Sequence, residues 1–304
     1  MFDINTIKVL HIEPTTVCQA SCPQCAREDP VYYNDTKHRN ELSLNDLKKI
    51  ISTEVIKNLD KMFMCGNFGD PAAARECLEI YKWFRSINPN ITLGLNTNGA
   101  LKNPAWWHRL GKLFCNPRDY VVFSIDGLED TNHIYRKNVN WNKLMNNVTA
   151  FIKAGGSAHW DMLIFEHNEH QVNLAKNLAK DMGFSWFRCK VSKRFFSKPI
   201  DFLQPPKNYQ LLNVEEPDSI QCYALDEKSM FLAANGELLP CCWIGSSVFN
   251  RTTELDRALN TELFSGVSES WKNTPLQVCS KTCGTKKYSK TNFEEQWKQE
   301  VQLR

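Results

Sequence analysis

Six strand-like segments that alternate with helix-like segments constrain the fold of this sequence more than any other feature. The strands are short apolar runs over residues 7–12, 61–65, 91–95, 120–125, 159–165 and 186–191. The helices are amphipathic segments over residues 43–56, 72–87, 104–114, 141–155 and 170–184. This order predicts a parallel sheet with right-handed crossovers. Six units are fewer than the eight of a closed TIM barrel, so we predict an α/β fold built on a partial (β/α)6 TIM-like barrel.

The alternation ends near residue 197, and a second, smaller unit is expected after it. Two adjacent prolines in a polar stretch over residues 197–210 predict a connector. Residues 222–284 predict short strands and turns around cysteines, with a hairpin over 234–240 that turns at an Asn-Gly pair. We therefore divide the chain into a barrel domain (1–205), a small cysteine-rich α+β domain (206–290) and a helical tail (291–304).

The composition indicates a soluble globular protein and limits its partners. The 304 residues are 42% hydrophobic and 23% charged, with a net charge of +3. That charge is too small to favour a nucleic-acid partner. No apolar run reaches the length of a transmembrane helix, and the N-terminus lacks the features of a signal peptide. We expect a cytoplasmic protein with no membrane partner, whose 12 cysteines serve metal binding or catalysis rather than disulfides.

Three cysteines follow the first strand with the spacing C-x3-C-x2-C, at Cys18, Cys22 and Cys25. Three thiolates from one loop can hold three irons of a cubane cluster and leave the fourth iron open to a small molecule. Zinc is the alternative metal, although zinc sites usually use two cysteine pairs or cysteines with histidines. A zinc-binding scaffold without catalytic activity therefore remains a competing hypothesis.

The cysteine motif resembles the cluster-binding motif of the radical S-adenosylmethionine (radical SAM) superfamily. Further stretches follow successive strands in the order found in that family: GNFGDP (66–71), NTNG (96–99) and SIDG (124–127), and then Arg136. Two residues depart from the family pattern. Gln24 stands where the family usually has an aromatic residue, and Asp70 stands where it more often has glutamate.

The resemblance implies a [4Fe–4S] cluster on the three cysteines, with SAM bound beside it. It implies that Gly69 and Asp70 bind the methionyl amine of SAM, and that Asn96 and Asn98 lie near the ribose. It also implies that Ser124 contacts the ribose or the carboxylate and that Arg136 binds the carboxylate. Reductive cleavage of SAM then produces a 5′-deoxyadenosyl radical, which abstracts hydrogen from the substrate.

Asp126 is a candidate catalytic residue, because it lies two residues beyond Ser124 at the end of a strand. A carboxylate there can accept a proton from a substrate radical. An aspartate that only shapes the Asp-Gly turn is the alternative.

The remaining cysteine set has the pattern C-x13-G-x4-C followed by C-x3-C, at Cys222, Cys241, Cys279 and Cys283. It resembles the twitch domain, the short form of the SPASM domain. The resemblance implies one auxiliary [4Fe–4S] cluster that is closed by four thiolates. Cys242 is a second candidate beside Cys241, and a zinc knuckle is the alternative for the whole region. The auxiliary cluster can accept an electron, orient the substrate or stabilise the small domain.

These features predict a radical SAM oxidoreductase that acts on a peptide or a small molecule. The resemblance implies an electron donor such as flavodoxin or ferredoxin. Because the first strand begins at residue 7, binding of a leader peptide by a preceding domain is disfavoured. An RNA substrate is a further alternative, which the small net charge and the lack of a basic, aromatic-rich stripe argue against.

Overall fold

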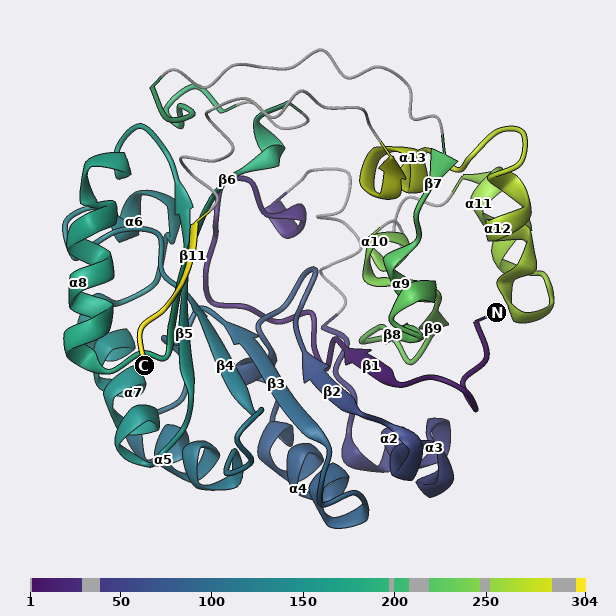
Figure 1. The fold of residues 1–304 in the computed structure, drawn as a ribbon, viewed down its shortest axis with the longest axis horizontal. Coiled ribbons are helices and arrows are strands. Elements are labelled where there is room, and N and C mark those ends of the chain that lie inside the picture. Colours follow the sequence, from purple (N-terminus) through teal and green to yellow (C-terminus); the bar gives the residue numbers. More distant parts are fainter. Residues whose placement is uncertain (1, 29–38, 197–199, 208–218, 247–251, 286–298) are drawn as a thin grey trace.

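The structure is a computed structural model of the 304-residue chain. It describes residues 2–28, 39–196, 200–207, 219–246, 252–285 and 299–304, which are coloured in Figure 1. Within these residues, nine strands form one sheet in the order β11-β6-β5-β4-β3-β2-β1-β8-β9. No helix in the described part of the chain is long and apolar enough to span a membrane.

All six predicted strands are present, and neighbours pair in parallel from β1 to β6. They are β1 (Val9–Ile12), β2 (Lys61–Met64), β3 (Thr92–Thr97), β4 (Tyr120–Ser124), β5 (Ala158–Ile164) and β6 (Trp186–Val191). The sheet curves as the prediction of a partial barrel requires, and its strands end at one common edge (Figure 1).

Helices cover the outer face of the curved sheet (Figure 1). The longer ones are α2 (Leu44–Ile50), α3 (Thr53–Asn58), α4 (Cys77–Ile87), α5 (Pro104–Leu113), α7 (Trp141–Lys153) and α8 (Val172–Met182). Shorter segments lie in the loops, namely η1 (Ala26–Glu28), η2 (Pro71–Ala73), α6 (Asn132–Tyr135), η3 (Glu169–Gln171) and η4 (Lys193–Phe196). The single helix expected over 43–56 is divided into two, because Ser43 caps α2 and Ser52 caps α3.

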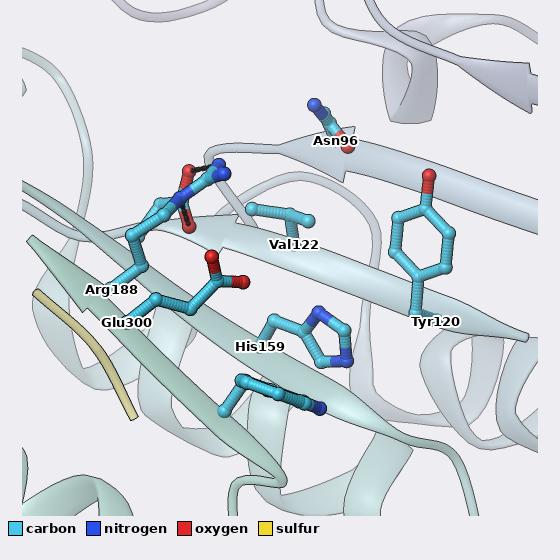
Figure 2. Close-up of a pocket in the computed structure, with 8 residues that line it drawn as sticks. Asn96, Tyr120, Val122, His159, Arg188 and Glu300 are labelled. Carbon is cyan, nitrogen blue, oxygen red and sulfur yellow. Dashed lines mark hydrogen bonds and ion pairs between the residues drawn. The ribbon is translucent and has the colours of Figure 1, made fainter. Parts of the chain in front are cut away.

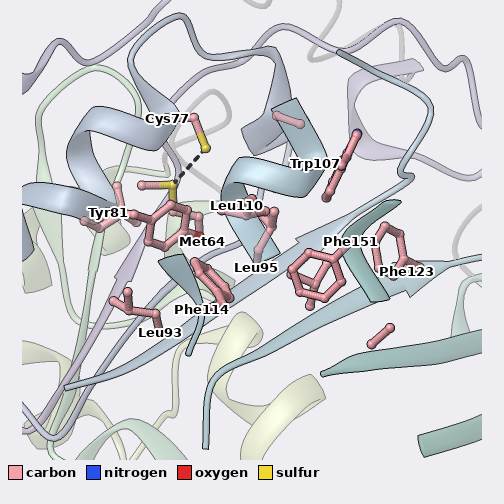
Figure 3. Close-up of a cluster of buried hydrophobic side chains, with 14 of the residues drawn as sticks. Met64, Cys77, Tyr81, Leu93, Leu95, Trp107, Leu110, Phe114, Phe123 and Phe151 are labelled. Atoms are coloured by element: carbon pink, nitrogen blue, oxygen red, sulfur yellow. Dashed lines mark hydrogen bonds between the residues drawn. The ribbon is translucent and has the colours of Figure 1, made fainter. Parts of the chain in front are cut away.

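The hydrophobic core lies between the sheet and these helices (Figure 3). Trp107 of α5 packs on Phe123 of β4, with ring centroids 5.3 Å apart. Strand β5 shows how the two faces differ. Trp160 and Met162 are fully buried on the helix side, whereas Asp161 and its alternate neighbours are only partly buried. Full burial of each large apolar side chain contributes about 1.5–3 kcal/mol, so packing on the outer face stabilises the sheet. The inner face carries polar as well as apolar side chains.

The predicted hairpin is present, and it joins the barrel sheet. Strands β8 (Ser229–Leu232) and β9 (Leu238–Leu239) pair in antiparallel fashion, and Gly236 at the turn has φ of +88°. Strand β8 pairs in parallel with β1, so the cysteine-rich region continues the sheet. The sequence pattern predicts the hairpin but not this pairing, because register across distant segments has no local signal.

The rest of the cysteine-rich region is mostly helical, not the short strands that the sequence predicts. It contains α9 (Tyr223–Asp226), α10 (Cys242–Gly245), α11 (Thr253–Leu259), η5 (Glu262–Phe264), α12 (Ser265–Ser270) and α13 (Gln277–Cys283), with the strand pair β7 (Ser219–Ile220) and β10 (Gly284–Thr285). These helices enclose a second apolar core that includes Phe231, Leu239, Ile244 and Val267.

The helix expected at the C-terminal tail is wrong for the residues that the structure describes. Residues Gln299–Gln302 form strand β11, which pairs with β6 in antiparallel register. Strand β6 would otherwise present a row of unpaired N–H and C=O groups at the edge of the sheet, and β11 pairs them. The alternation of polar and apolar residues over 300–304 fits a strand. The rest of the predicted tail helix lies outside the described residues.

Candidate active site

The three cysteines of the first motif lie in the loop after β1, at the edge where the parallel strands end. Cys22 is buried, and Cys18 and Cys25 are partly buried. The backbone N–H of Cys25 donates to the carbonyl of Cys22 at 2.9 Å and turns the loop back on itself. Burial raises the pKa of the Cys18 thiol to about 12. A metal centre on this thiolate must therefore displace a tightly held proton.

Gln24 holds the cysteine loop against the last strand of the barrel. Its side chain is buried, and Ser192 Oγ donates to Gln24 Oε1 at 2.7 Å. The guanidinium of Arg194 donates to the Gln24 carbonyl at 3.0 Å. Both partners directly follow β6, so this loop is fixed to the first and the last strands of the parallel set. Here a polar tether stands at the position where the family resemblance led us to expect an aromatic residue.

Asp70, in the loop after β2, is fully engaged by the protein itself. Its carboxylate accepts from the Ala72 N–H at 2.9 Å and from Thr97 Oγ1 at 2.9 Å. It also accepts from the backbone N–H of Asn98 at 2.7 Å and from Asn98 Nδ2 at 2.6 Å. Burial raises the pKa of Asp70, and the hydrogen bonds from Asn98 and Thr97 oppose that rise. The carboxylate thus ties the loop after β2 to the loop after β3.

Asn98 carries this connection onward to the cysteine loop. Its Nδ2 lies 3.6 Å from Cys18 Sγ in a hydrogen bond, and its Oδ1 accepts from Gln19 Nε2 at 2.7 Å. Asp70 therefore determines the orientation of the amide that contacts Cys18. N–H donors to cysteine sulfur are among the features that set the potential of an iron–sulfur cluster.

Gly69 packs against the backbone of the cysteine loop. A Cβ at this position would lie 1.9 Å from the carbonyl oxygen of Thr15, so no other residue fits without moving the loop. Glu13, which the sequence analysis did not single out, holds the same segment. Its Oε1 accepts from the N–H groups of Phe68 at 2.7 Å and Gly69 at 3.2 Å. Burial raises the pKa of Glu13 to about 7. A charged residue directly after an apolar strand was the signal that could have identified it.

Asp126 and Arg136 form a buried ion pair beside Cys22. Arg136 Nε donates to Asp126 Oδ2 at 2.6 Å, and the Leu163 N–H donates to Asp126 Oδ1 at 2.6 Å. Arg136 Nη1 lies 3.7 Å from Cys22 Sγ. Burial raises the pKa of Asp126, and the positive charge of Arg136 opposes that rise. Both oxygens of Asp126 are engaged, so its geometry is that of a residue that positions Arg136.

Ser124 and Asn96 lie on the inner face of the sheet, apart from these contacts. Ser124 is the last residue of β4 and stands opposite Asp161 of β5. Asn96 lies in β3, opposite Val122. Asn98 is therefore the one of the two predicted asparagines that reaches the cysteine loop, whereas Asn96 faces the barrel interior.

The second cysteine set comes from three short helices. Cys222 and Cys241 occupy the N-cap positions of α9 and α10, and Cys279 and Cys283 lie on α13. Burial raises the pKa of Cys241 to about 12, and the thiols of Cys279 and Cys222 raise it further. Burial also raises the pKa of the Cys283 thiol, and the nearby Cys222 thiol adds to that rise. The fold thus brings these four thiols into electrostatic range of one another. Among the described residues, no three Cys, His, Asp or Glu side chains converge as they would on a single metal ion.

Cys242 packs against the second apolar core and lies near groups of the barrel. Burial raises the pKa of its thiol, and the next contributions come from Cys241 and then from Cys65 and Glu13 of the barrel. Asn67 Nδ2 donates to the Cys242 carbonyl at 2.9 Å, which joins the loop after β2 to α10. The geometry therefore groups Cys241 with the other three cysteines and places Cys242 at the boundary with the barrel.

A curved parallel sheet with a cysteine loop after its first strand defines the class of this protein. The family model of the radical SAM superfamily matches residues 12–178, which is more than half of the chain. The chain belongs to the radical SAM superfamily. Membership implies a [4Fe–4S] cluster and SAM as cofactors, and the loop of Cys18, Cys22 and Cys25 has the donor set that such a cluster needs.

Solved structures share the fold at low sequence identity. SuiB of Streptococcus suis bound to precursor peptide SuiA aligns with a TM-score of 0.58 and 15% identity, over 86% of this chain and 67% of that one. SuiB bound to S-adenosylmethionine aligns with a TM-score of 0.56 and 14% identity, over 90% and 77%. Native anSMEcpe with bound AdoMet aligns with a TM-score of 0.55 and 14% identity, over 91% and 89%. No curated protein matches the sequence of this chain.

Proposed function

We propose that this chain is a radical SAM oxidoreductase with its first [4Fe–4S] cluster on Cys18, Cys22 and Cys25. The observation that carries the proposal is the convergence on this loop of the segments that follow β2, β3 and β4. When bound, the reduced cluster supplies the electron that splits SAM into methionine and the 5′-deoxyadenosyl radical, which takes hydrogen from the substrate.

The side chains around the loop have separable tasks in this proposal. Asp70 orients Asn98, whose amide donates to Cys18. Asp126 orients Arg136, whose guanidinium contacts Cys22. The guanidinium has five N–H groups, and Asp126 takes only Nε, so other N–H groups of Arg136 remain for the SAM carboxylate.

The methionyl amine of SAM is left to the backbone of the loop after β2. Both oxygens of Asp70 already accept hydrogen bonds from the protein, so the carbonyls near Gly69 are the acceptors that we assign to the amine. Ser124 remains the candidate for the ribose or the carboxylate. Burial of Cys22, Asp70 and Asp126 keeps water from the reacting groups.

The second set, Cys222, Cys241, Cys279 and Cys283, is proposed to hold one auxiliary [4Fe–4S] cluster in a twitch/SPASM-like unit over residues 206–290. Backbone N–H groups at the start of α10 donate to the Cys241 sulfur and lower its pKa against the effect of burial. Four thiolates close such a cluster and favour electron transfer. Held by these four cysteines, such a cluster would supply an acceptor for an electron from the substrate, and the overall reaction would then be an oxidation.

The proposed substrate is a peptide or a small molecule, and the proposed reductant is a flavodoxin or ferredoxin in the cytoplasm. SuiB bound to precursor peptide SuiA, and anSMEcpe with bound AdoMet and a peptide, support the peptide alternative. The competing proposal is a zinc scaffold without activity.

Metal analysis and SAM cleavage after anaerobic purification decide between these proposals. We expect about eight irons per chain and release of 5′-deoxyadenosine with SAM and dithionite. The triple variant Cys18→Ala, Cys22→Ala, Cys25→Ala should keep about four irons and release none. Stoichiometric zinc, no iron after reconstitution and no deoxyadenosine would establish the scaffold instead.

A further inference from the structure

A cavity of about 240 Å³ lies on the inner face of the sheet and has no role in the site described above. Its walls come from β3, β4, β5, β6 and the C-terminal strand β11, whose side chains stand on one side of the sheet (Figure 2). We call it the inner-face cavity. Asn96, Tyr120, His159, Arg188 and Glu300 are the lining residues that matter for its chemistry.

Strand register places this cavity directly beside the proposed SAM site. Ser124 stands opposite Asp161, Asp161 opposite Arg188, and Arg188 opposite Glu300, so these residues form one row across four strands. Asn96, Val122, His159 and Trp186 form the next row, two residues nearer the start of each strand. Tyr120, opposite Gly94, lies one row further from the strand ends. A ligand in the cavity therefore lies one to two pleats from the strand end that carries Ser124.

The charged groups of the cavity balance one another. Arg188 binds Asp161 through two hydrogen bonds, and Lys190 Nζ lies 3.6 Å from the same carboxylate. Asp161 raises the pKa of the Arg188 guanidinium, and the carboxylate of Glu300 raises it further by a smaller amount. Asp161 and Glu300 thus offset Arg188 and Lys190, and the third cation nearby, Lys61, lies over the rings of Phe63 and Tyr120. A ligand needs no net charge to be accommodated here.

The remaining polar groups of the cavity are neutral. The Oδ1 atom of Asn96 is buried and accepts no hydrogen bond from any described residue. The hydroxyl of Tyr120 also makes no hydrogen bond within the part of the chain that the structure describes. His159 keeps one partner, since its Nε2 lies 3.5 Å from Ser157 Oγ. Burial lowers the pKa of His159 to about 4, so the imidazole is neutral at pH 7 and its Nδ1 remains for a ligand. An amide oxygen, a phenol and a neutral imidazole together need a ligand that both donates and accepts.

Aromatic faces complete the cavity. The rings of Tyr120 and His159 stack with centroids 5.3 Å apart and an interplanar angle of 14°. Lys61 lies 5.0 Å from the Tyr120 centroid. A Cβ at Gly94 would come within 2.6 Å of the Tyr120 ring, so the glycine is what allows the ring to lie across β3. These faces suit the C–H groups of a small ligand, while the polar atoms around them suit its hydroxyls.

We propose that the inner-face cavity binds the substrate through a neutral, hydroxyl-bearing group. This inference rests on the proposed radical SAM function, since it assigns the cavity to the substrate of that reaction. Pockets for drug-sized ligands occupy roughly 300–1,000 Å³, so the cavity holds either a small free molecule or one side chain of a peptide. Glu300 and Arg188 form its charged rim, and Asn96 and Tyr120 select for hydroxyls.

Saturation-transfer NMR on the cluster-free variant Cys18→Ala, Cys22→Ala, Cys25→Ala tests binding without any radical chemistry. The probes are methyl α-D-glucoside, the blocked peptide Ala-Ser-Ala, butyrate and butylamine. We expect saturation transfer to the glucoside or to the serine peptide. Which of these two probes binds distinguishes a free molecule from a peptide side chain as the ligand. Adding Tyr120→Phe or Asn96→Leu should raise the Kd of that probe by about two- to ten-fold each, because each change removes one hydrogen bond.

Tyr223→Phe is the matched control, because Tyr223 is 60% exposed and lies on α9, away from the cavity. It should leave the Kd unchanged. Binding of butyrate or butylamine in place of the hydroxyl probes, binding of no probe, or a Kd insensitive to both cavity variants would overturn the proposal. A failure of SAM cleavage in the wild-type protein, with hydroxyl binding intact, would count against the proposed function alone.

Discussion

The first cysteine set spans eight residues of one loop, whereas the second is spread over residues 222–283 on three short helices. The loop of the first set is fixed from outside, by Asn98 on Cys18 and by Arg136 on Cys22. The second set rests on its own small apolar core. The comparison shows that a local motif still needs supports from distant strands, while a dispersed motif exists only after its helices pack.

The largest difference should appear when one cysteine is removed from each set. Cys22→Ala should abolish 5′-deoxyadenosine release. Cys241→Ala should keep that release and lose about four irons, because only the second cluster opens. Chromatography of deoxyadenosine together with iron analysis checks both.

Cys242→Ser is the control for this pair, because Cys242 is not one of the four proposed ligands and lies within electrostatic range of Cys65 and Glu13 of the barrel. It should retain about eight irons. Equal loss of deoxyadenosine in the Cys22 and Cys241 variants would show that the two sets are not independent.

Breaking the support of Cys22 should have the next largest effect. Arg136→Gln leaves Asp126 buried without its cation, and removal of one partner of a buried pair costs about 3–5 kcal/mol. Urea denaturation should show that loss in the free energy of unfolding. Arg75→Gln breaks an ion pair with Glu41 in which Arg75 is 86% exposed, and it should leave stability nearly unchanged. Similar losses of unfolding free energy in both variants would show that the ion pair of Arg136 stabilises the fold no more than the exposed ion pair of Arg75.

Glu13 makes the support of the loop after β2 depend on pH. Burial raises its pKa from 4.5 to about 7 in the folded state. The folded protein therefore binds the proton more tightly than the unfolded chain, and the free energy of unfolding falls as pH rises from about 4.5 to about 7. Glu13→Gln keeps an acceptor for Phe68 and removes the charge.

The difference in unfolding free energy between wild type and Glu13→Gln should therefore grow over this pH window. It should reach about 3 kcal/mol in favour of the variant at pH 8. Thermal or urea unfolding at pH 4, 6 and 8 measures it. A difference that stays constant across the three pH values would contradict the assignment.

The support of Cys18 should give the smallest effect. Asp70→Asn replaces an acceptor of several hydrogen bonds by a group that can accept at only one of its two polar atoms. We expect a loss of about 1–3 kcal/mol in the free energy of unfolding, with a shifted potential of the first cluster by redox titration. Asp60→Asn, at an exposed site with its side chain in water, should change neither. An unchanged cluster potential in the Asp70 variant would show that the amide of Asn98 does not influence the first cluster.

Local patterns were sufficient for the barrel because each signal lies within a few residues. The capping box of Ser43 and Asp46 and the apolar runs of the six strands depend on neighbours in the chain. The helix prediction for the C-terminal tail was wrong for the opposite reason. Residues 299–302 become a strand because the edge of β6 is available to them, and that edge has no counterpart in the local sequence.

The sequence by itself determined the order of strands and helices, the cysteine loop after the first strand and the residue types that approach it. Only the tertiary structure decided what those residues contact. It turned Asp126 toward Arg136, placed Glu13 under the loop after β2 and put Asn96 over a cavity that also includes Glu300. Such contacts join positions that lie far apart in the chain, and strand register and burial determine them only once the sheet has formed.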